Sequence, residues 1–489
     1  MHRAAQDAGQ GPDVDDRIVQ AVAPQDSDRI RSRRLISGIG TAVLSRGTNV
    51  LVPLLLIPAT LSYLGTDRYG LWMAVTALTG MVAFADLGLG NGLMTKLAPC
   101  LAAGDIERAR RYVSSAYLVL GGTAGAITAL LWLLGGRVPW DAVFNVTGAV
   151  SPAEARSISL ICLTAFVVNV PLSLVNRVQY ARQQVGLSNI WQGVGAGLAL
   201  PFALAAIAAG MSATVVVAAT VVGPVLVNVV NTVWTFGWRV PELAPWAGRA
   251  TGRLTRELLG LGGLFFVLTI VMSMATNADT LIIAHRLGLE SVTEYAVPAR
   301  FVTQLGLLVT LVNVPLWAMN GDSLARGEVE WVRRTARRMT YVSVCCALVP
   351  TAGLVLVGDR LFFRWLGVPI GQDRWLLIGL AAWLVMLAAI SPRFMVQNAA
   401  GVVRPQLLGW GLYLVLSVVA KWYGVGWYGI SVVPYIGVGC YLLTVLPAAL
   451  YGYRRALLLH SPAGAHRSND RHDEKGRLDD HEAPLQVHG

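Results

Sequence analysis

The stretch FADLGLGNGLMTKLAPCLAAGDIERARR, residues 84–111, begins apolar and glycine-rich and ends as a charged segment. Its last part, LAAGDIERARR at 101–111, recurs as LARGEVEWVRR at 324–334, an offset of 223 residues. Upstream, Tyr63-Leu64-Gly65 aligns with Arg286-Leu287-Gly288 at the same offset. Several matches at one offset predict an internal duplication. Glu107 and Arg111 lie four residues apart, as do Glu330 and Arg334, so both pairs are expected to stabilise short connecting helices.

The composition of the chain indicates a membrane protein. Of its 489 residues, 55% are hydrophobic and 14% charged, and the mean hydropathy is +0.56. Soluble domains carry roughly 25% charged residues. About twelve apolar runs reach the roughly 20 residues that a membrane-spanning helix needs, and short gaps separate them. The sequence therefore predicts an all-α, polytopic membrane protein with about 12 transmembrane helices.

The basic residues predict the orientation. The net charge is +11, and arginines concentrate in alternate gaps between the apolar runs, whereas the other gaps, to which we assign Lys421, hold few. By the positive-inside rule both termini are cytoplasmic. Because the charges lie in short gaps between apolar runs, we expect the basic residues to face membrane lipids, and we expect no nucleic-acid partner.

Six predicted spans separate the two copies, so both halves have the same orientation. Such a parallel repeat predicts two six-helix lobes, with the substrate between them and access alternating from side to side. The predicted divisions are a cytoplasmic polar tail (1–34), an N-terminal lobe (35–236), a cytoplasmic linker (237–258), a C-terminal lobe (259–455) and a disordered cytoplasmic tail (456–489).

Cofactor and metal motifs are absent from the sequence. The five cysteines show no metal-ligand spacing, and their odd number argues against a disulfide framework. None of the three lysines follows a phosphate-binding glycine loop. We therefore predict no cofactor, no metal and no ATP site.

Three motifs carry a family resemblance: Y-G-L-W at 69–72, F-A-D-L-G-L-G-N-G-L at 84–93, and L-A-A-G-D-x-E-x-A-R-R at 101–111. With them the chain, over roughly residues 35–455, resembles the Wzx-type polysaccharide flippases of the multidrug/oligosaccharidyl-lipid/polysaccharide exporter superfamily. The resemblance implies a MATE-like fold and a transporter, not an enzyme.

The resemblance also implies a substrate and partners. Such proteins move polyprenyl-pyrophosphate-linked oligosaccharides across the bacterial inner membrane for lipopolysaccharide or exopolysaccharide biosynthesis. A cavity lined by cationic side chains is implied, with H⁺ or Na⁺ as the candidate coupling ion. A polysaccharide polymerase is a candidate partner.

Arg46 is the first candidate substrate ligand. It lies about ten residues into the first predicted span, hence ~15 Å deep, where charge is costly and usually functional. Asn49 follows on the same helical face. Guanidinium binds phosphate oxygens bidentately, so Arg46 could hold the pyrophosphate. A structural ion pair between helices is the alternative.

A second set of polar residues lies in the seventh and eighth predicted spans. Asp279 and Arg300 are at similar depth, so the simplest prediction is an ion pair between them, with Asn277 nearby. The functional alternatives are an H⁺ or Na⁺ site at Asp279 and an anion site at Arg300. Asp86 lies ~24 Å from the outer entry of its span, and we predict a cytoplasmic gate or helix-end anchor there.

Two other functions compete with a flippase. A small-molecule or drug antiporter of the same superfamily would prefer an acidic, aromatic cavity, whereas pyrophosphate would need arginine. A membrane polysaccharide polymerase or ligase is the third candidate, but the longest predicted outer gap, 135–157, is short and lacks a catalytic cluster.

Overall fold

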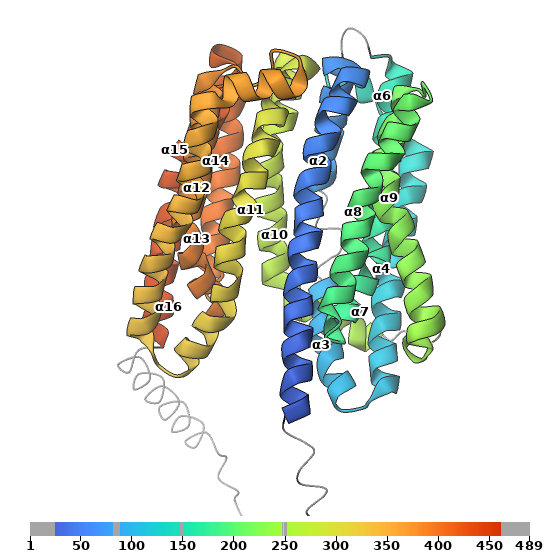
Figure 1. Ribbon diagram of the computed structural model, residues 1–489, viewed down its shortest axis with the longest axis vertical. Coiled ribbons are helices and arrows are strands. Elements are labelled where there is room, and N and C mark those ends of the chain that lie inside the picture. The colour runs from blue at the N-terminus through green and yellow to red at the C-terminus, as the bar shows by residue number, and fades with distance from the viewer. Residues whose placement is uncertain (1–24, 82–88, 147–149, 247, 249–251, 461–489) are drawn as a thin grey trace, which may run out of the picture.

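The computed structural model describes residues 25–81, 89–146, 150–246, 248 and 252–460. Within these ranges the regular structure is helical and no strand occurs. Figure 1 shows two helical bundles side by side, with α2 and α10 between them. Nine described helices are long and apolar enough to cross a membrane. The two arms of α2 and helix α11 bring the spans to about twelve, which confirms the predicted all-α membrane fold.

Eight α-helices form the described part of the N-terminal lobe. They are α2 (Gln25–Met81), α3 (Leu89–Ala102), α4 (Ile106–Leu134), α5 (Trp140–Val143), α6 (Pro152–Leu172), α7 (Leu174–Ala181), α8 (Val185–Ala208) and α9 (Ala213–Trp234). Helix α2 begins inside the segment predicted as a polar tail. It folds back at Gly65, whose φ of 74° and ψ of 173° separate two spans. After α9 come a π-helical turn, η2 (Thr235–Arg239), and a short 3₁₀ turn, η3 (Pro241–Leu243).

Between residues 252 and 460 the C-terminal lobe contains seven α-helices. They are α10 (Gly252–Leu287), α11 (Leu289–Ala325), α12 (Val329–Leu366), α13 (Arg374–Ala399), α14 (Arg404–Tyr428), α15 (Val432–Leu443) and α16 (Val445–Leu459). The pair α15 and α16 forms one span, as α6 and α7 do in the first lobe. Short turns connect consecutive spans, so each pair of neighbours is antiparallel.

The duplicated motif folds into the same turn twice. Gly104 and Gly327 have φ values of 71° and 73°, a left-handed conformation that favours glycine. Each is followed by the same backbone hydrogen bond: Asp105 N donates to Cys100 O (3.0 Å) and Glu328 N donates to Ser323 O (2.9 Å). These turns define one end of the molecule, which we call the Gly104 end.

A second pair of turns repeats at an offset of 218 residues. The backbone N of Gln184 donates to Gln179 O, and that of Val402 donates to Gln397 O, both at 2.9 Å. At the opposite end Gly65 and Gly288, the other predicted pair, both have positive φ, 74° and 90°. Matching turns at matching offsets show that the lobes are parallel repeats.

The surface ion pairs of the repeated helices differ slightly from the prediction. Arg111 Nε lies 3.2 Å from Glu107 Oε1, as expected. Glu330 instead pairs with Arg333, at 3.1 Å, so the predicted pairing with Arg334 is wrong. Positions three and four residues apart both lie within reach on a helix, and spacing alone does not choose between them.

The lobes touch closely at the end of the molecule that contains Gly65, which we call the Gly65 end. Thr293 Oγ1 of α11 donates to Thr66 O of α2 at 2.7 Å. Gly70 lies so close to α11 that a Cβ added there would overlap the carbonyl oxygen of Leu289. Asn145 Nδ2 of the first lobe donates to His285 O of the second at 3.2 Å. Hydrogen bonds and close backbone contact thus hold the lobes together at this end.

Candidate functional site

A cavity of about 220 Å³ lies on the inner side of the N-terminal lobe and receives one cation from the other lobe. Its walls come mainly from the two arms of α2 and from α8 and α9. They consist of Val52, Pro53, Leu56, Ile57, Thr60, Tyr69, Trp72, Thr76, Ala196, Ala199, Thr220 and Val221. Arg300 of α11 completes the lining. The cavity therefore combines apolar and aromatic walls with a single guanidinium that crosses the interface between the lobes.

Arg300 has no acidic partner in the described part of the chain. Its NH1 lies 3.3 Å from the sulfur of Met73, a weak acceptor that leaves the positive charge uncompensated. A charge in an apolar cavity is costly unless an anion accompanies it. Guanidinium matches the geometry of phosphate and carboxylate oxygens. The arrangement is therefore suited to an anionic group beside an apolar one.

For the other two predicted substrate ligands the structure describes the helix but not the side chains. Arg46 and Asn49 belong to α2, the helix that supplies Pro53 to the cavity wall, but their side chains lie outside the described residues. Asp86 also lies outside the described residues. Its predicted role as a gate or anchor stays a prediction.

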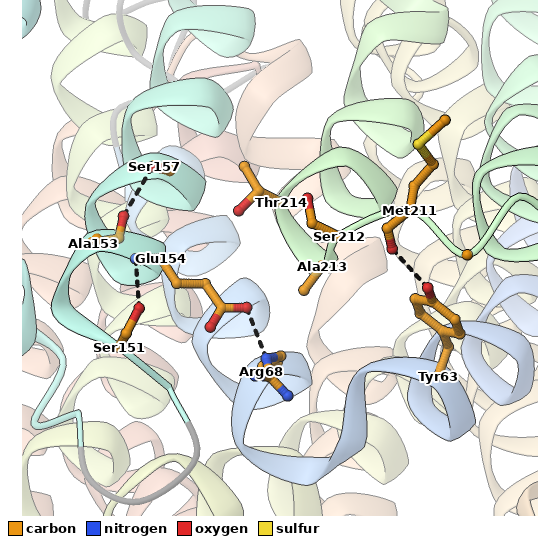
Figure 2. Close-up of a pocket in the computed structure, with 11 residues that line it drawn as sticks. Tyr63, Arg68, Ser151, Ala153, Glu154, Ser157, Met211, Ser212, Ala213 and Thr214 are labelled. Atoms are coloured by element: carbon orange, nitrogen blue, oxygen red, sulfur yellow. Dashed lines mark hydrogen bonds and ion pairs between the residues drawn. The ribbon is translucent and has the colours of Figure 1, made fainter.

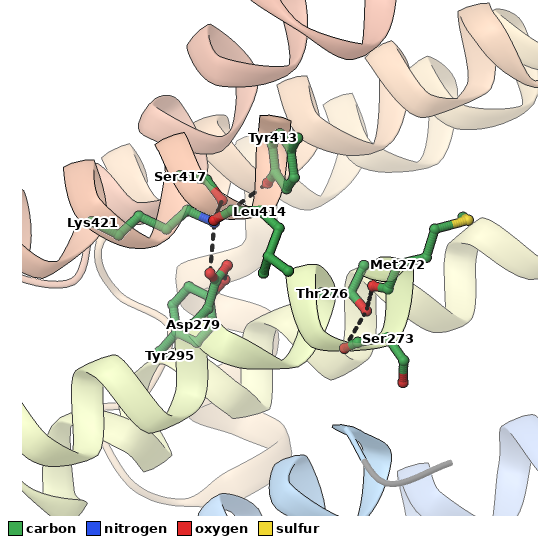
Figure 3. Close-up of polar contacts among 9 residues, drawn as sticks. All are labelled: Met272, Ser273, Thr276, Asp279, Tyr295, Tyr413, Leu414, Ser417 and Lys421. Carbon is green, nitrogen blue, oxygen red and sulfur yellow. Dashed lines mark hydrogen bonds and ion pairs between the residues drawn. The ribbon is translucent and has the colours of Figure 1, made fainter. Parts of the chain in front are cut away.

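Asp279 is paired, but with a residue that the sequence did not suggest. Its Oδ1 lies 2.6 Å from Nζ of Lys421 on α14, and Tyr295 Oη donates to Oδ2 at 3.1 Å (Figure 3). The side chains of Lys421 and Asp279 are only 3% and 14% exposed. The predicted pair between Asp279 and Arg300 is therefore wrong. Lys421, assigned to an outer gap, lies inside α14, and packing of α14 against α10 brings it to Asp279.

An aromatic shell surrounds the Lys421 end of this pair. Tyr413 Oη lies 3.4 Å from Nζ, and the ring of Tyr413 contacts those of Trp383, Trp410 and Tyr441. Such surroundings exclude water and strengthen the attraction between the two charges. The C-terminal lobe therefore contains a buried, compensated ion pair, whereas the cavity contains an uncompensated cation.

Asn277 does not join this pair. Its side chain packs against Gly80 of α2 and donates to Ser273 O at 2.8 Å. Ser273 Oγ in turn donates to Gly80 O. Asn277 thus belongs to the contact between the lobes. His285 of the same helix stacks on Trp422 at a centroid distance of 5.2 Å.

A buried network of amides within the N-terminal lobe was not predicted from the sequence. Gln179 Nε2 donates to Asn231 Oδ1 at 2.6 Å, and Asn176 Nδ2 donates to Asn228 Oδ1 at 3.3 Å. Amide hydrogen bonds of this kind hold membrane helices together, here α7 to α9. The spacing of Asn228 and Asn231, three residues apart in an apolar span, was the signal that could have revealed it.

A second, more polar hollow of about 650 Å³ opens at the Gly65 end of the N-terminal lobe (Figure 2). Arg68 Nε and Glu154 Oε1 lie 2.7 Å apart across it, and Tyr63 Oη donates to Met211 O at 2.6 Å. Hydroxyl groups of Ser151, Ser157, Ser212 and Thr214 line the rest. These contacts connect the bend of α2 to the start of α6 and to the turn between α8 and α9, so the hollow forms the polar rim of this lobe.

Comparison with known sequences establishes the family. Residues 35–317 match the sequence model of a family described as "Polysaccharide biosynthesis protein". The chain belongs to this family. The match confirms the resemblance that the motifs at 69–111 indicated. No curated protein matches the chain.

Solved structures show how the polysaccharide biosynthesis family member folds. An inward-facing multidrug resistance MATE family transporter of the MOP superfamily matches with a TM-score of 0.66 and 16% identity, covering 86% of this chain and 95% of that one. An outward-facing MATE transporter matches with a TM-score of 0.62 and 15% identity, covering 87% and 96%. A MOP superfamily transporter from Pyrococcus furiosus, described as having a binding pocket of reverse polarity, matches with a TM-score of 0.61 and 17% identity, covering 86% and 96%. The chain thus has the fold of the MATE transporters.

Proposed function

We propose that this chain is a flippase that moves polyprenyl-pyrophosphate-linked oligosaccharides from the cytoplasmic to the periplasmic leaflet of the bacterial inner membrane. Its family membership supports a place in polysaccharide biosynthesis. The proposal includes cytoplasmic termini, a cytoplasmic Gly104 end and the predicted tails and linker. Arginine-rich turns at the Gly104 end support this sidedness.

Arg300 is the observation that carries the proposal. A lipid pyrophosphate is both strongly anionic and attached to an apolar chain, and the cavity offers one uncompensated guanidinium among apolar and aromatic side chains. Arg46, predicted near mid-membrane depth on α2, would supply a second guanidinium. Pyrophosphate would then be held by one cation from each lobe.

Alternating access supplies the mechanism of the proposal. The contacts of Thr66 with Thr293 and of Gly70 with Leu289 close the Gly65 end. Breaking them while the lobes rotate would open the cavity to the periplasm. Because Arg300 belongs to the second lobe and the cavity walls to the first, such rotation would also withdraw the guanidinium and release the anion.

Asp279 is the proposed coupling residue. Both of its carboxylate oxygens already have partners, and the ammonium of Lys421 balances its charge. A Na⁺ ion would have to displace Lys421, whereas a proton would need only to neutralise the carboxylate. We therefore favour H⁺ over Na⁺ as the coupling ion.

The alternative is an ion-coupled antiporter of small molecules. The similarity to MATE structures supports this alternative. The aromatic residues Tyr69 and Trp72 in the cavity would suit a drug. A cationic drug would, however, meet the uncompensated charge of Arg300. No catalytic cluster supports the polymerase or ligase among the residues that the structure describes.

Reconstitution in proteoliposomes tests the proposal. We expect transfer of a polyprenyl-pyrophosphate-linked oligosaccharide between leaflets, and a loss of about 10- to 100-fold in Arg300→Ala, because a hydrogen bond to a charged group contributes roughly 1.5–3 kcal/mol. Arg300→Lys should retain part of the rate. Arg286→Ala is the matched control, since Arg286 stacks over Trp422 outside the cavity. Drug efflux without lipid transfer would favour the antiporter instead.

A further inference from the structure

A cluster of arginines lies at the Gly104 end of the C-terminal lobe, far along the chain from the cavity residues of the first lobe. Helix α12 has 38 residues, about 57 Å of helix, whereas the hydrocarbon core is only about 30 Å thick. Its first turns therefore extend past the core. Arg333 and Arg337 lie there, one turn apart on the same face.

A third arginine from a neighbouring helix joins them. Arg393 of α13 is half-buried, and its NH1 donates to Ala389 O at 2.9 Å and to Thr340 Oγ1 at 3.5 Å. Thr340 lies one turn beyond Arg337 on α12. In the described part of the chain Arg393 has no carboxylate partner.

Tyr453 of α16 lies beside the cluster. It packs against the apolar core that Val332 and Ala336 of α12 share with Val396 of α13. Glu330 is already paired with Arg333 at 3.1 Å. The site, formed by α12, α13 and α16, therefore keeps an excess of positive charge.

The equivalent position in the N-terminal lobe keeps one of the three arginines and is covered. Arg110, the counterpart of Arg333, donates from Nε to Ala244 O at 3.1 Å. Ser114, the counterpart of Arg337, accepts from Trp246 N at 3.0 Å. Val175, the counterpart of Arg393, is fully buried. The chain that follows η3 thus covers this face of the first lobe.

No described segment covers the cationic face of the second lobe, where Arg333 is 56% exposed at its side chain. We propose that this face, defined by Arg333, Arg337, Arg393 and Tyr453, binds the phosphate of an anionic phospholipid in the cytoplasmic leaflet. Guanidinium forks bind phosphate oxygens bidentately, and basic clusters where spanning helices leave the membrane attract anionic lipids. The proposal depends on the proposed sidedness and not on the transported substrate.

The surroundings favour a lipid over a soluble anion. Apolar side chains on the membrane side of the cluster, Leu348 on α12 and Leu450 on α16, are exposed by 50% and 39%, so acyl chains can lie against the helices beneath the phosphate. Inorganic phosphate would use only the arginines. The chain's own segment 461–489, which carries six acidic residues, is the competing occupant.

Native mass spectrometry of the full-length protein in detergent tests the proposal. Phosphatidylglycerol should bind more tightly than phosphatidylcholine. Arg337→Gln should weaken the binding of phosphatidylglycerol about 5-fold, and Arg337→Gln/Arg393→Gln should weaken it about 25-fold. Each basic side chain near an anionic headgroup contributes about 5-fold in affinity. Arg338→Gln is the matched control. Arg338 directly follows Arg337, about 100° around the helix, and is also exposed, so its loss should leave binding unchanged.

Three outcomes of the mass spectrometry would overturn the proposal. These are equal binding of both lipids, equal loss in Arg338→Gln and Arg337→Gln, or full competition by inorganic phosphate. A photo-crosslinking residue at Tyr453 gives an independent readout in nanodiscs that contain phosphatidylglycerol. Adducts with lipid support the proposal, and adducts with peptides from 461–489 identify the tail as the occupant. Arg337 is exposed, so the single variant is expected to fold even where the double variant does not.

Discussion

The ammonium of Lys421 lies 2.6 Å from a carboxylate oxygen of Asp279, and both side chains are almost entirely withdrawn from solvent. Removal of one partner from such a pair leaves a buried charge uncompensated. We expect Lys421→Met to lower the free energy of unfolding by roughly 3–5 kcal/mol.

The double variant Asp279→Asn/Lys421→Met removes both charges and should recover most of that loss. Thermal unfolding of the purified protein in one detergent measures the loss of stability in Lys421→Met, in Asp279→Asn and in the double variant. If the loss in the double variant equals the sum of the two single losses, the pair contributes no coupling energy.

The same pair makes a prediction about the coupling ion. Because Lys421 already balances Asp279, lipid transfer should continue when Na⁺ is replaced by choline, and it should respond to a proton gradient. In Asp279→Asn the response to the proton gradient should disappear. Transfer rates in proteoliposomes, with each gradient imposed in turn, provide the measurement. A strict requirement for Na⁺ would contradict the assignment.

The repeated turns predict a strain that depends on backbone conformation alone. Gly104 and Gly327 have positive φ and open space around the missing Cβ, so alanine should destabilise each turn by about 1–2 kcal/mol. Gly121→Ala in α4 is the control, because Gly121 also has open space but ordinary helical geometry. It should be neutral or stabilising by up to about 1 kcal/mol. Equal effects at Gly104 and Gly121 in thermal unfolding would refute the argument.

Much of the fold was predictable because lipid imposes simple rules. Backbone groups in hydrocarbon must bond within a helix, so an apolar run of sufficient length already implies a span. The helix pair around Gly65, joined without a loop, still appears as two apolar runs. The offset that relates Gly104 to Gly327 also revealed the parallel lobes, since both turns need a left-handed residue.

The side-chain partners were not predictable in the same way. Asp279 and Arg300 seemed a natural pair because neighbouring spans place them at similar depth. Lys421 is 142 residues from Asp279, and only the packing of α14 against α10 brings them together. Depth can be estimated from one span, but a partner depends on how several helices rotate and cross.

Arg46 carries the strongest prediction that comes from the sequence alone. Its expected position near mid-membrane implies a cavity or a partner, because an isolated guanidinium in hydrocarbon is costly. Arg46→Ala should abolish polysaccharide export in a complementation assay while the protein stays in the membrane. Arg68→Ala, at the rim, is the comparison variant and should retain export. Normal export by Arg46→Ala would remove this residue from the site.

Closure of the Gly65 end predicts that a reversible crosslink between the lobes at this end will stop transport. Thr293 Oγ1 contacts the backbone carbonyl of Thr66 across the two lobes, so cysteines at both positions should be joined through disulfide bonds by a short bis-methanethiosulfonate crosslinker when the native cysteines are replaced by serine. If the lobes must separate there in each cycle, the crosslink should stop lipid transfer, and a reductant should restore it. Cysteines at Asn313 and Ser343, which touch within the second lobe, should crosslink without stopping transfer. Transfer that continues at full rate with the Thr66–Thr293 crosslink complete would show that opening at the Gly65 end is not part of the transport cycle.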